Sequence, residues 1–343
     1  MKTRVLKSNA SSIAKAANVL RRGGLVAFPT ETVYGLGGRA FDPAAARRIY
    51  RAKGRPADNP LIVHVADEAM LASVASRVTP LARRLMAAFW PGPLTLVLEK
   101  RTRVPSAVTA GKSTVAVRCP GHPAARALIR ALGEPIAAPS ANRSGRPSPT
   151  AAKHVLRDLS GRIPLILDGG SCRRGLESTI IDARGRRPVL LRPGTLSEAA
   201  IARAAGAPLA APGPRAPAAP GTRHLHYAPS CRVILVPPAL IRRGALSGLS
   251  RPGMGLVHRS EWPGPRPAWT ARVNGGVAAY ARALFASLRD AESAGVKTLY
   301  VETVADRGVG RAVMDRLRRA SATGFNRAMG EIGVGPKTAR AMP

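Results

Sequence analysis

Hydroxyl-bearing residues gather where the first strongly apolar run of the chain ends. The segment Phe28-Pro-Thr-Glu-Thr-Val-Tyr-Gly-Leu-Gly37 carries Thr30 and Thr32, and its glycines Gly35 and Gly37 permit a positive φ. A polar, glycine-rich turn of this kind could present hydroxyls to a bound phosphate. On its own, the pattern favours a plain tight turn from a strand into a helix.

Two cations flank a glycine further along the chain, in Lys53-Gly-Arg-Pro-Ala-Asp-Asn-Pro-Leu-Ile-Val-His64. Lys53 and Arg55 stand at the expected C-terminus of a helix, where positive charge suits the helix dipole. The functional alternative is a phosphate clamp, in which Arg55 makes bidentate contacts and Lys53 adds a point charge. His64 closes an apolar run, where a single histidine is usually a satisfied core residue.

Arg118 ends the apolar run of residues 115–117, where an unpaired charge would be costly. It needs an anionic partner, which is either a carboxylate of the protein or that of a bound substrate. Because the chain has only 19 acidic residues, we favour a substrate carboxylate.

Later segments again place polar side chains beside apolar runs. Ser140 and Asn142 follow residues 135–138 on one face of a polar turn, where they could bind phosphate or ribose or simply form the turn. Ser178 precedes another apolar run, and Arg192 ends the next one. The sequence has no GxxxxGK[ST] loop, no GxGxxG between a strand and a helix, and no GxSxG elbow. Phosphate would therefore have to be held by scattered side chains and backbone amides.

The apolar pattern predicts a mixed α/β fold that positions these segments. Strand-like runs cover residues 25–28, 61–65, 94–98, 115–117, 135–138, 165–167, 179–181 and 189–191. Helices are expected from a cap at Ser11 or Ser12, from Asp42-Pro43, and over residues 81–89, 122–132 and 150–159. So many strands among few helices indicate one twisted mixed sheet.

The composition changes at residue 207 to Pro, Ala and Gly with little periodicity, which indicates a linker stiffened by its prolines. Beyond it, strand-like residues 233–236 and 298–301 flank an amphipathic helix with apolar positions between Val277 and Leu288. A length of 343 residues suits two cores, so we expect a second, smaller α/β domain.

The formal net charge of +35 raises the question of RNA binding, because basic surfaces attract phosphate backbones. Of the 54 basic residues nine are Lys and the other 45 are Arg, spread along the whole chain. Arg with abundant Ala also fits the codon bias of a GC-rich genome. The charge alone does not decide between these interpretations.

The cysteines argue against a metal site or a disulfide framework. Cys119, Cys172 and Cys231 lie far apart and form no CxxC pair, which fits a reducing, cytoplasmic location. No apolar run approaches the length of a membrane span, so we expect no membrane contact.

Taken together and in this order, the segments resemble the threonylcarbamoyl-AMP synthase family with its YrdC-like domain. The matching motifs lie between about residues 8 and 200 and read PTETVYGLG, KGRP, DNPLIVH, WPGPLT, VAVRCP, APSAN, GLESTI and LRPG. HYAP at residues 226–229 and the segment 308–321 resemble the longer form of the family. The resemblance implies an α/β fold: a YrdC-like twisted mixed sheet domain over residues 1–206, a Pro-rich linker or lid over 207–230, and a small Rossmann-like domain over 231–343.

The resemblance also implies roles for individual residues. Lys53 and Arg55 would be catalytic. L-threonine would contact Thr32, His64, Arg118, the backbone near Ala138, and Ser178. ATP would contact Arg55, Asn59, Thr114, Ser140, Asn142, Ser148, Arg192 and Tyr227, the last as part of a lid.

The implied activity is that of a nucleotidyltransferase. It would form L-threonylcarbamoyladenylate and pyrophosphate from L-threonine, bicarbonate or CO₂, and ATP, for the modification of adenosine 37 in tRNAs that read ANN codons. Mg²⁺ would be bound mainly through ATP phosphates, with no metal site made by the protein. Downstream tRNA-threonylcarbamoyl transferase machinery would use the product, and direct contact with tRNA would be weak.

Two other functions compete with this one. An RNA-binding or tRNA-chaperoning protein is motivated by the net charge, and tight, salt-dependent tRNA binding would favour it. A carbamoyl-adenylate enzyme of hydrogenase maturation is the other, but such proteins carry zinc-finger segments that three cysteines cannot supply.

Overall fold

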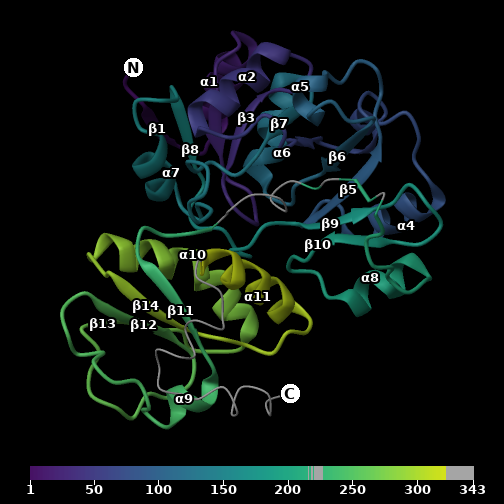
Figure 1. The fold of residues 1–343 in the computed structure, drawn as a ribbon. Coiled ribbons are helices and arrows are strands. Elements are labelled where there is room, and N and C mark those ends of the chain that lie inside the picture. The colour runs from purple at the N-terminus through teal and green to yellow at the C-terminus, as the bar shows by residue number, and fades with distance from the viewer. Residues whose placement is uncertain (215, 218, 220–226, 322–343) are drawn as a thin grey trace. The chain divides into compact units, whose positions relative to one another are not determined.

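The computed structural model of the chain describes residues 1–214, 216, 217, 219 and 227–321 (Figure 1). It divides into two compact units, one made of Met1–Ser144 with Ser148–His224 and the other of Gly145–Pro147 with Leu225–Pro343. Part of the predicted linker and the histidines of its His-Leu-His sequence, His224 and His226, lie outside the described residues.

The first unit is built on a mixed sheet, as the sequence predicts. The sheet has ten strands in the order β1-β8-β2-β3-β7-β4-β6-β5-β9-β10. Its strands are β1 Arg4–Lys7, β2 Val26–Phe28, β3 Gly35–Arg39, β4 Ile62–His64, β5 Leu94–Glu99, β6 Thr114–Arg118, β7 Ile136–Ala138, β8 Leu165–Asp168, β9 Thr179–Asp182 and β10 Val189–Arg192. Its helices are α1 Ala10–Arg21, α2 Pro43–Lys53, α3 Glu68–Leu71, α4 Pro80–Phe89, α5 Ser106–Thr109, α6 Pro123–Leu132, α7 Ala152–Leu159 and α8 Glu198–Ala205.

Strand pairing brings several predicted site residues to one edge of this sheet. β4 and β6 run parallel and end side by side, with His64 opposite Arg118. β5 is antiparallel to β6 and parallel to β9, and β10 is antiparallel to β9. The start of β9, preceded by Ser178, and the end of β10, at Arg192, therefore lie at the edge where β4 and β6 end.

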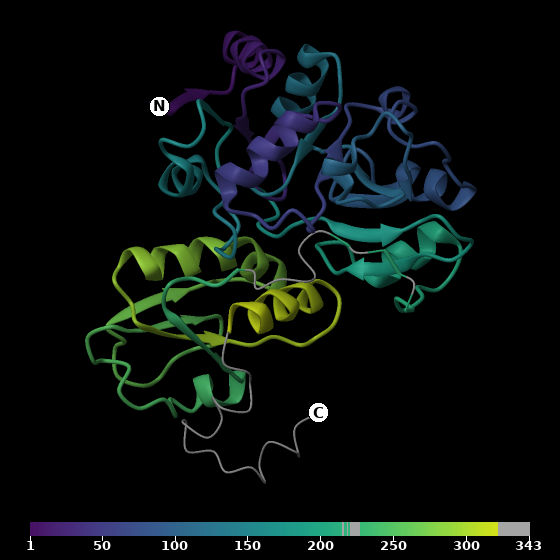
Figure 2. The same cartoon turned by 45° about the horizontal axis from the view of Figure 1, so that its top comes forward.

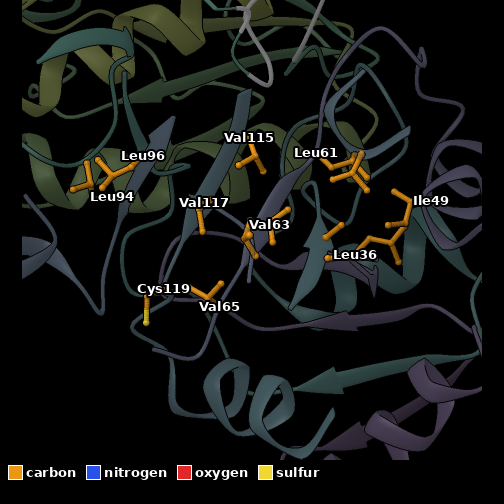
Figure 3. Close-up of a cluster of buried hydrophobic side chains, with 14 of the residues drawn as sticks. Leu36, Ile49, Leu61, Val63, Val65, Leu94, Leu96, Val115, Val117 and Cys119 are labelled. Atoms are coloured by element: carbon orange, nitrogen blue, oxygen red, sulfur yellow. The ribbon is translucent and has the colours of Figure 1, made fainter. Parts of the chain in front are cut away.

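Two of the apolar clusters pack against opposite faces of the sheet. The larger one joins Ile49 of α2 and Leu85 of α4 to strand residues such as Val63 and Val117, and Figure 3 shows its central part. The smaller one joins Leu20 of α1 and other residues of α1 and α6 to the opposite sides of β2 and β7. Because side chains alternate along a strand, β2 contributes to both clusters, which fixes its register.

The glycine-rich segment after Phe28 leads into a strand, and the predicted turn into a helix is wrong. Residues 35–39 form β3, which pairs antiparallel with β2, and neither Gly35 nor Gly37 takes a positive φ. Glycine is needed there because neighbouring side chains come close. A Cβ at Gly37 would lie 2.7 Å from Cγ2 of Ile136 and 2.9 Å from Cε1 of Phe28.

We therefore expect Gly37→Ala to destabilise the protein by about 1–3 kcal/mol, since an overpacked core must shift to admit a methyl group. Chemical denaturation followed by circular dichroism measures this. Gly185→Ala is the matched control, because its Cβ would meet nothing within 4 Å. Equal stability of the two variants would contradict the packing role of Gly37.

The second unit has a four-stranded parallel sheet, which confirms the predicted Rossmann-like domain. Its elements are β11 Arg232–Val236, α9 Pro238–Arg242, β12 Met254–His258, β13 Trp269–Arg272, α10 Val277–Ser293, β14 Thr298–Glu302 and α11 Val309–Ala320, with the strand order β11-β14-β12-β13. Figure 2 shows α10 and α11 on one side of this sheet and α9 on the other. Helices on both faces are typical of parallel sheets.

None of the helices in the described part of the chain is both long enough and apolar enough to cross a membrane.

Candidate active site

The predicted site residues share an unusual property, which is that most of them are polar and buried. Their exposed fractions are at most 9% for Thr32, Lys53, Arg55, Asn59, His64, Thr114, Arg118, Asn142, Ser148, Ser178 and Arg192. Burying polar groups costs free energy unless each finds a partner. Their partners therefore define the site.

Arg118 is held by three residues from two loops at the edge where β6 ends. Its Nη1 donates to Oγ1 of Thr32 at 2.8 Å, and its Nε donates to the carbonyl of Gly92 at 3.2 Å. Its Nη2 forms an ion pair of 2.7 Å with Oε1 of Glu31. The sequence favoured a substrate carboxylate as the partner of this charge, but in the structure a protein carboxylate faces it. The small number of acidic residues in the sequence does not indicate which of them the fold places beside Arg118.

Glu31 is itself fixed between Arg118 and the backbone. Its Oε2 accepts from the N–H of Gly121 at 3.0 Å. Burial alone would raise the pKa of this carboxyl, but the charge and hydrogen bond of Arg118 and the backbone N–H groups lower the pKa on balance. Glu31 is therefore an anion at neutral pH.

His64 lies beside Arg118 and is neutral. Burial, with the positive charge of Arg118, lowers the pKa of His64 from 6.5 to about 3. Its ring packs edge-on against Phe28 with centroids 5.9 Å apart, and its Nδ1 lies 3.2 Å from the carbonyl of Ile62. The imidazole can thus orient a substrate by hydrogen bonding, but it carries no exchangeable positive charge near pH 7.

The depressed pKa of His64 predicts a pH dependence of stability. Because the unfolded chain binds this proton with a pKa near 6.5 and the folded chain only near 3, stability is complete above pH 6.5 and is lost as the pH falls toward 3. The free energy of unfolding, measured as a function of pH, should therefore fall less steeply from pH 6.5 to pH 4 for His64→Gln than for the parent chain. Parallel curves would show that His64 does not titrate in this way.

A second cluster surrounds the C-terminus of α2. Lys53 Nζ donates to the carbonyls of Ser140 and Asn142 and lies 3.5 Å from Oδ1 of Asn142. Ser140 Oγ donates to that same Oδ1 at 2.5 Å. Arg55 is tied to the next loop, since its Nε donates to the carbonyl of Asn59 at 3.1 Å and its Nη2 to Oδ1 of Asn59.

A third cluster lies where β9 begins. Arg192 Nη2 donates to the carbonyl of Ser178 at 2.9 Å and to its Oγ at 3.2 Å. Ser178 Oγ is also 2.7 Å from Oγ1 of Thr95. Close by in sequence, Glu177 accepts from Oγ of Ser148, so that two chain segments meet through these side chains. The site is thus a set of cations, hydroxyls and amides held mostly by one another.

Comparison with known proteins decides the family. A Sua5, YciO and YrdC family model with the description "Telomere recombination" matches residues 18–194, and the "Threonylcarbamoyl-AMP synthase, C-terminal domain" model matches residues 195–322. The threonylcarbamoyl-AMP synthase of Pyrococcus abyssi is 45% identical over 89% of this chain and 93% of its own length. The chain belongs to the threonylcarbamoyl-AMP synthase family.

A further relative and a solved structure agree with this assignment. The threonylcarbamoyl-AMP synthase of Bacillus subtilis is 42% identical over 92% of this chain and 94% of its own length. The crystal structure of P. abyssi Sua5 complexed with L-threonine is 42% identical and covers 93% of this chain and 98% of that one, with a TM-score of 0.86. The resemblance drawn from the sequence motifs, and the fold it implied, are thereby confirmed.

Three further site residues are expected from the family resemblance. Thr114 begins β6, at the opposite end of that strand from Arg118. Ala138 ends β7 and pairs with Ile62, so it offers only its backbone. Tyr227 belongs to the second unit, where its ring stacks on Phe285 with centroids 5.3 Å apart.

Sequence reasoning assigned no role to Glu31, Thr95 or Glu177, which the structure places against predicted site residues. Each sits inside a motif that had already been noticed: Glu31 between Thr30 and Thr32, Thr95 in WPGPLT, and Glu177 beside Ser178. Their position in these family motifs was the signal that could have found them.

Proposed function

We propose that this chain synthesises L-threonylcarbamoyladenylate, as the names of its relatives indicate for them. The observation that carries the proposal is the buried Arg118 cluster, in a chain similar over most of its length to a Sua5 complexed with L-threonine. In the reaction, the amine of threonine adds to CO₂ and loses a proton to give a carbamate. A carbamate oxygen then forms a bond to the α-phosphorus of ATP, and the bond to pyrophosphate breaks.

The Arg118 cluster suits the recognition of an amino acid. A guanidinium has more N–H donors than the contacts to Thr32, Gly92 and Glu31 use, so Arg118 can also donate to the carboxylate of threonine. Thr32, His64, the backbone of Ala138, and Ser178 complete the proposed threonine site. Glu31 restrains the guanidinium, so that its orientation is set before the substrate binds.

The clusters around α2 and β9 suit the nucleotide. Lys53 and Arg55 are the proposed catalytic cations, because charge on the phosphates is best stabilised by donors already fixed in place. Asn59, Thr114, Ser140, Asn142, Ser148, Arg192 and Tyr227 are the proposed nucleotide contacts. Residues 207–230, including Tyr227, are the proposed lid that excludes water from the labile carbamate.

The cysteines are poor nucleophiles, and the proposed reaction needs no covalent intermediate on the protein. Burial raises the pKa of Cys172 to about 12 and that of Cys119 to about 11, so both remain thiols. This chemistry makes the protein a nucleotidyltransferase that transfers AMP to a carbamate.

Mg²⁺ is the proposed cofactor, held mainly by ATP phosphates. The described residues include no group of three or more His, Cys, Asp or Glu side chains placed to hold a metal ion. Mg²⁺ keeps water and phosphate ligands, and it would neutralise triphosphate charge when bound. We place the protein in the cytoplasm, upstream of machinery that transfers threonylcarbamoyl to tRNA, with weak tRNA contact of its own.

Pyrophosphate release from ATP and Mg²⁺ with bicarbonate, measured with and without L-threonine, tests the proposal. Release that requires threonine, and that serine does not support, is the expected result. Release without threonine would indicate another acceptor or plain ATP hydrolysis. No release from folded protein would favour the RNA-binding function, which a salt-titrated tRNA gel shift would then test.

A further inference from the structure

Four arginines line one hollow on the surface of the first unit. The hollow has a volume of about 350 Å³ and lies between the start of α4 and the turn that joins β9 to β10 (Figure 1). The arginines in its lining are Arg77, Arg84, Arg184 and Arg186. None of the lining residues in the described part of the chain is acidic. Because like charges repel, cations gathered in this way are stabilised by a bound anion.

The two walls of the hollow are joined by Thr79, which is the N-cap of α4. Its buried Oγ1 accepts from the N–H of Ala82 at 3.0 Å and donates to the carbonyl of Ala183 at 2.6 Å. The first contact caps the helix, and the second ties the start of the helix to the turn between β9 and β10. The backbone around the hollow is therefore fixed before any ligand binds.

Two of the four guanidiniums are held in place by the protein. Arg184 donates from Nε and Nη2 to Asp182 at 2.9 and 2.8 Å, so its charge is offset by this carboxylate and, at longer range, by Glu99. Arg84 donates from Nε and Nη2 to the carbonyl of Ala205 at 3.1 and 2.8 Å. A carbonyl is neutral, so Arg84 keeps its full positive charge at the hollow.

The other two guanidiniums, those of Arg77 and Arg186, are exposed. Among the residues that the structure describes, neither side chain has a hydrogen-bond or ion-pair partner. They come from two different segments, the loop before α4 and the turn after β9. The hollow thus offers three charges that no carboxylate offsets, those of Arg77, Arg84 and Arg186.

The hollow lies at the opposite end of β9 from the proposed active site. Ser178, which belongs to that site, precedes the first residue of β9, whereas the hollow adjoins the turn after Asp182, the last residue of the strand. A strand of four residues spans about 13 Å. The anion that suits this hollow is therefore a different one from the phosphates of the proposed ATP site.

We propose that this hollow binds the phosphate backbone of RNA, with Arg77 and Arg186 as contact residues. The proposal rests on the proposed function, whose product serves the modification of a tRNA. The planar fork of donors on a guanidinium matches the oxygens of a phosphate, and the counterions that RNA releases make the contact favourable at low salt. A chain of phosphates can meet cations from both segments at once, which favours RNA over a small phosphate compound.

The double variant Arg77→Gln with Arg186→Gln tests the proposal, and Arg4→Gln with Arg47→Gln is the matched control. Each variant removes two positive charges from exposed positions of the first unit. A fluorescent tRNA transcript is titrated with full-length protein at several salt concentrations. We expect the test variant to bind about 5- to 30-fold more weakly, and the slope of log K against log salt to fall by about 1.5–2. The control should bind like the parent chain.

Three outcomes would overturn the inference. Equal weakening in both double variants would show that the net charge of the protein binds RNA without this hollow. Unchanged binding in the test variant would exclude Arg77 and Arg186 as contacts. Tripolyphosphate, titrated by calorimetry, covers the third outcome. If it bound the parent chain through these two arginines while the tRNA transcript did not bind, the ligand of the hollow would be a free polyphosphate.

Pyrophosphate release separates this inference from the proposed function. Because the hollow lies at the far end of β9, the test variant should release pyrophosphate with threonine at the rate of the parent chain. If the parent chain released none, the proposed function would fail, while the tRNA titrations would still decide whether the hollow binds RNA.

Discussion

Replacing Arg118 with glutamine is expected to lower kcat/KM for threonine by about 10- to 150-fold, because a hydrogen bond to a charged group contributes roughly 1.5–3 kcal/mol. The KM for ATP should change little. The same variant should be less stable, since it leaves Glu31 as a buried carboxylate without its ion-pair partner. Pyrophosphate release and chemical denaturation measure the two effects.

A double variant separates substrate binding from stability. The double variant Arg118→Gln with Glu31→Gln lacks both the buried positive charge and the buried negative charge. Much of the lost stability should therefore return, while threonine use stays impaired. If ATP affinity collapsed while threonine kinetics stayed normal, the assignment of Arg118 to threonine would be wrong. Recovery of threonine use in the double variant would show that Arg118 acts only through Glu31.

Replacing Lys53 with methionine is expected to lower kcat by about 10²- to 10³-fold, the loss seen when a preorganised charge donor is removed. The buried ammonium organises the carbonyls of Ser140 and Asn142 and supplies a positive charge beside the proposed phosphate contacts. Lys53→Arg should not restore the rate, because a planar guanidinium cannot replace a compact ammonium in a buried site.

Lys15→Met is the control for this experiment, because Lys15 is exposed on α1 and its loss removes the same charge from the protein. It should retain the parent rate. A Lys53→Met variant with parent kcat and a folded circular dichroism spectrum would remove Lys53 from the catalytic machinery.

Local signals in the sequence were enough to predict much of the first unit. The α2 helix starts at its predicted cap Asp42 with Pro43 in the first turn, and ends at Gly54, whose φ is +62°. Each of these signals acts within a few residues of the helix end. The first helix shows their limit, because its cap is Asn9 and not the predicted Ser11 or Ser12. Asn and Ser are both good caps, so the choice depends on how α1 packs.

Contacts between segments that are distant in the sequence could not be predicted from these local signals. Nothing near Arg118 in the sequence points to Glu31, and the two meet only because the loop after β2 reaches the end of β6. β3 was missed for a related reason. Its Gly35 and Gly37 look like turn residues until Phe28 and Ile136 are seen beside them. The motifs therefore supplied the candidate residues, whereas the fold determines which of their side chains face one another.

The pairing of β1 with β8 has a consequence for synthesis of the protein on the ribosome. Arg4 lies opposite Leu165, and β8 also pairs with β2, so the first two strands of the unit made by the ribosome share a partner that emerges much later. At usual translation rates, β1 and the adjoining edge of β2 stay uncovered for about 10–30 s. An unpaired strand edge is a template for aggregation, so we expect this edge to be the part of the nascent chain that a chaperone would protect during that interval.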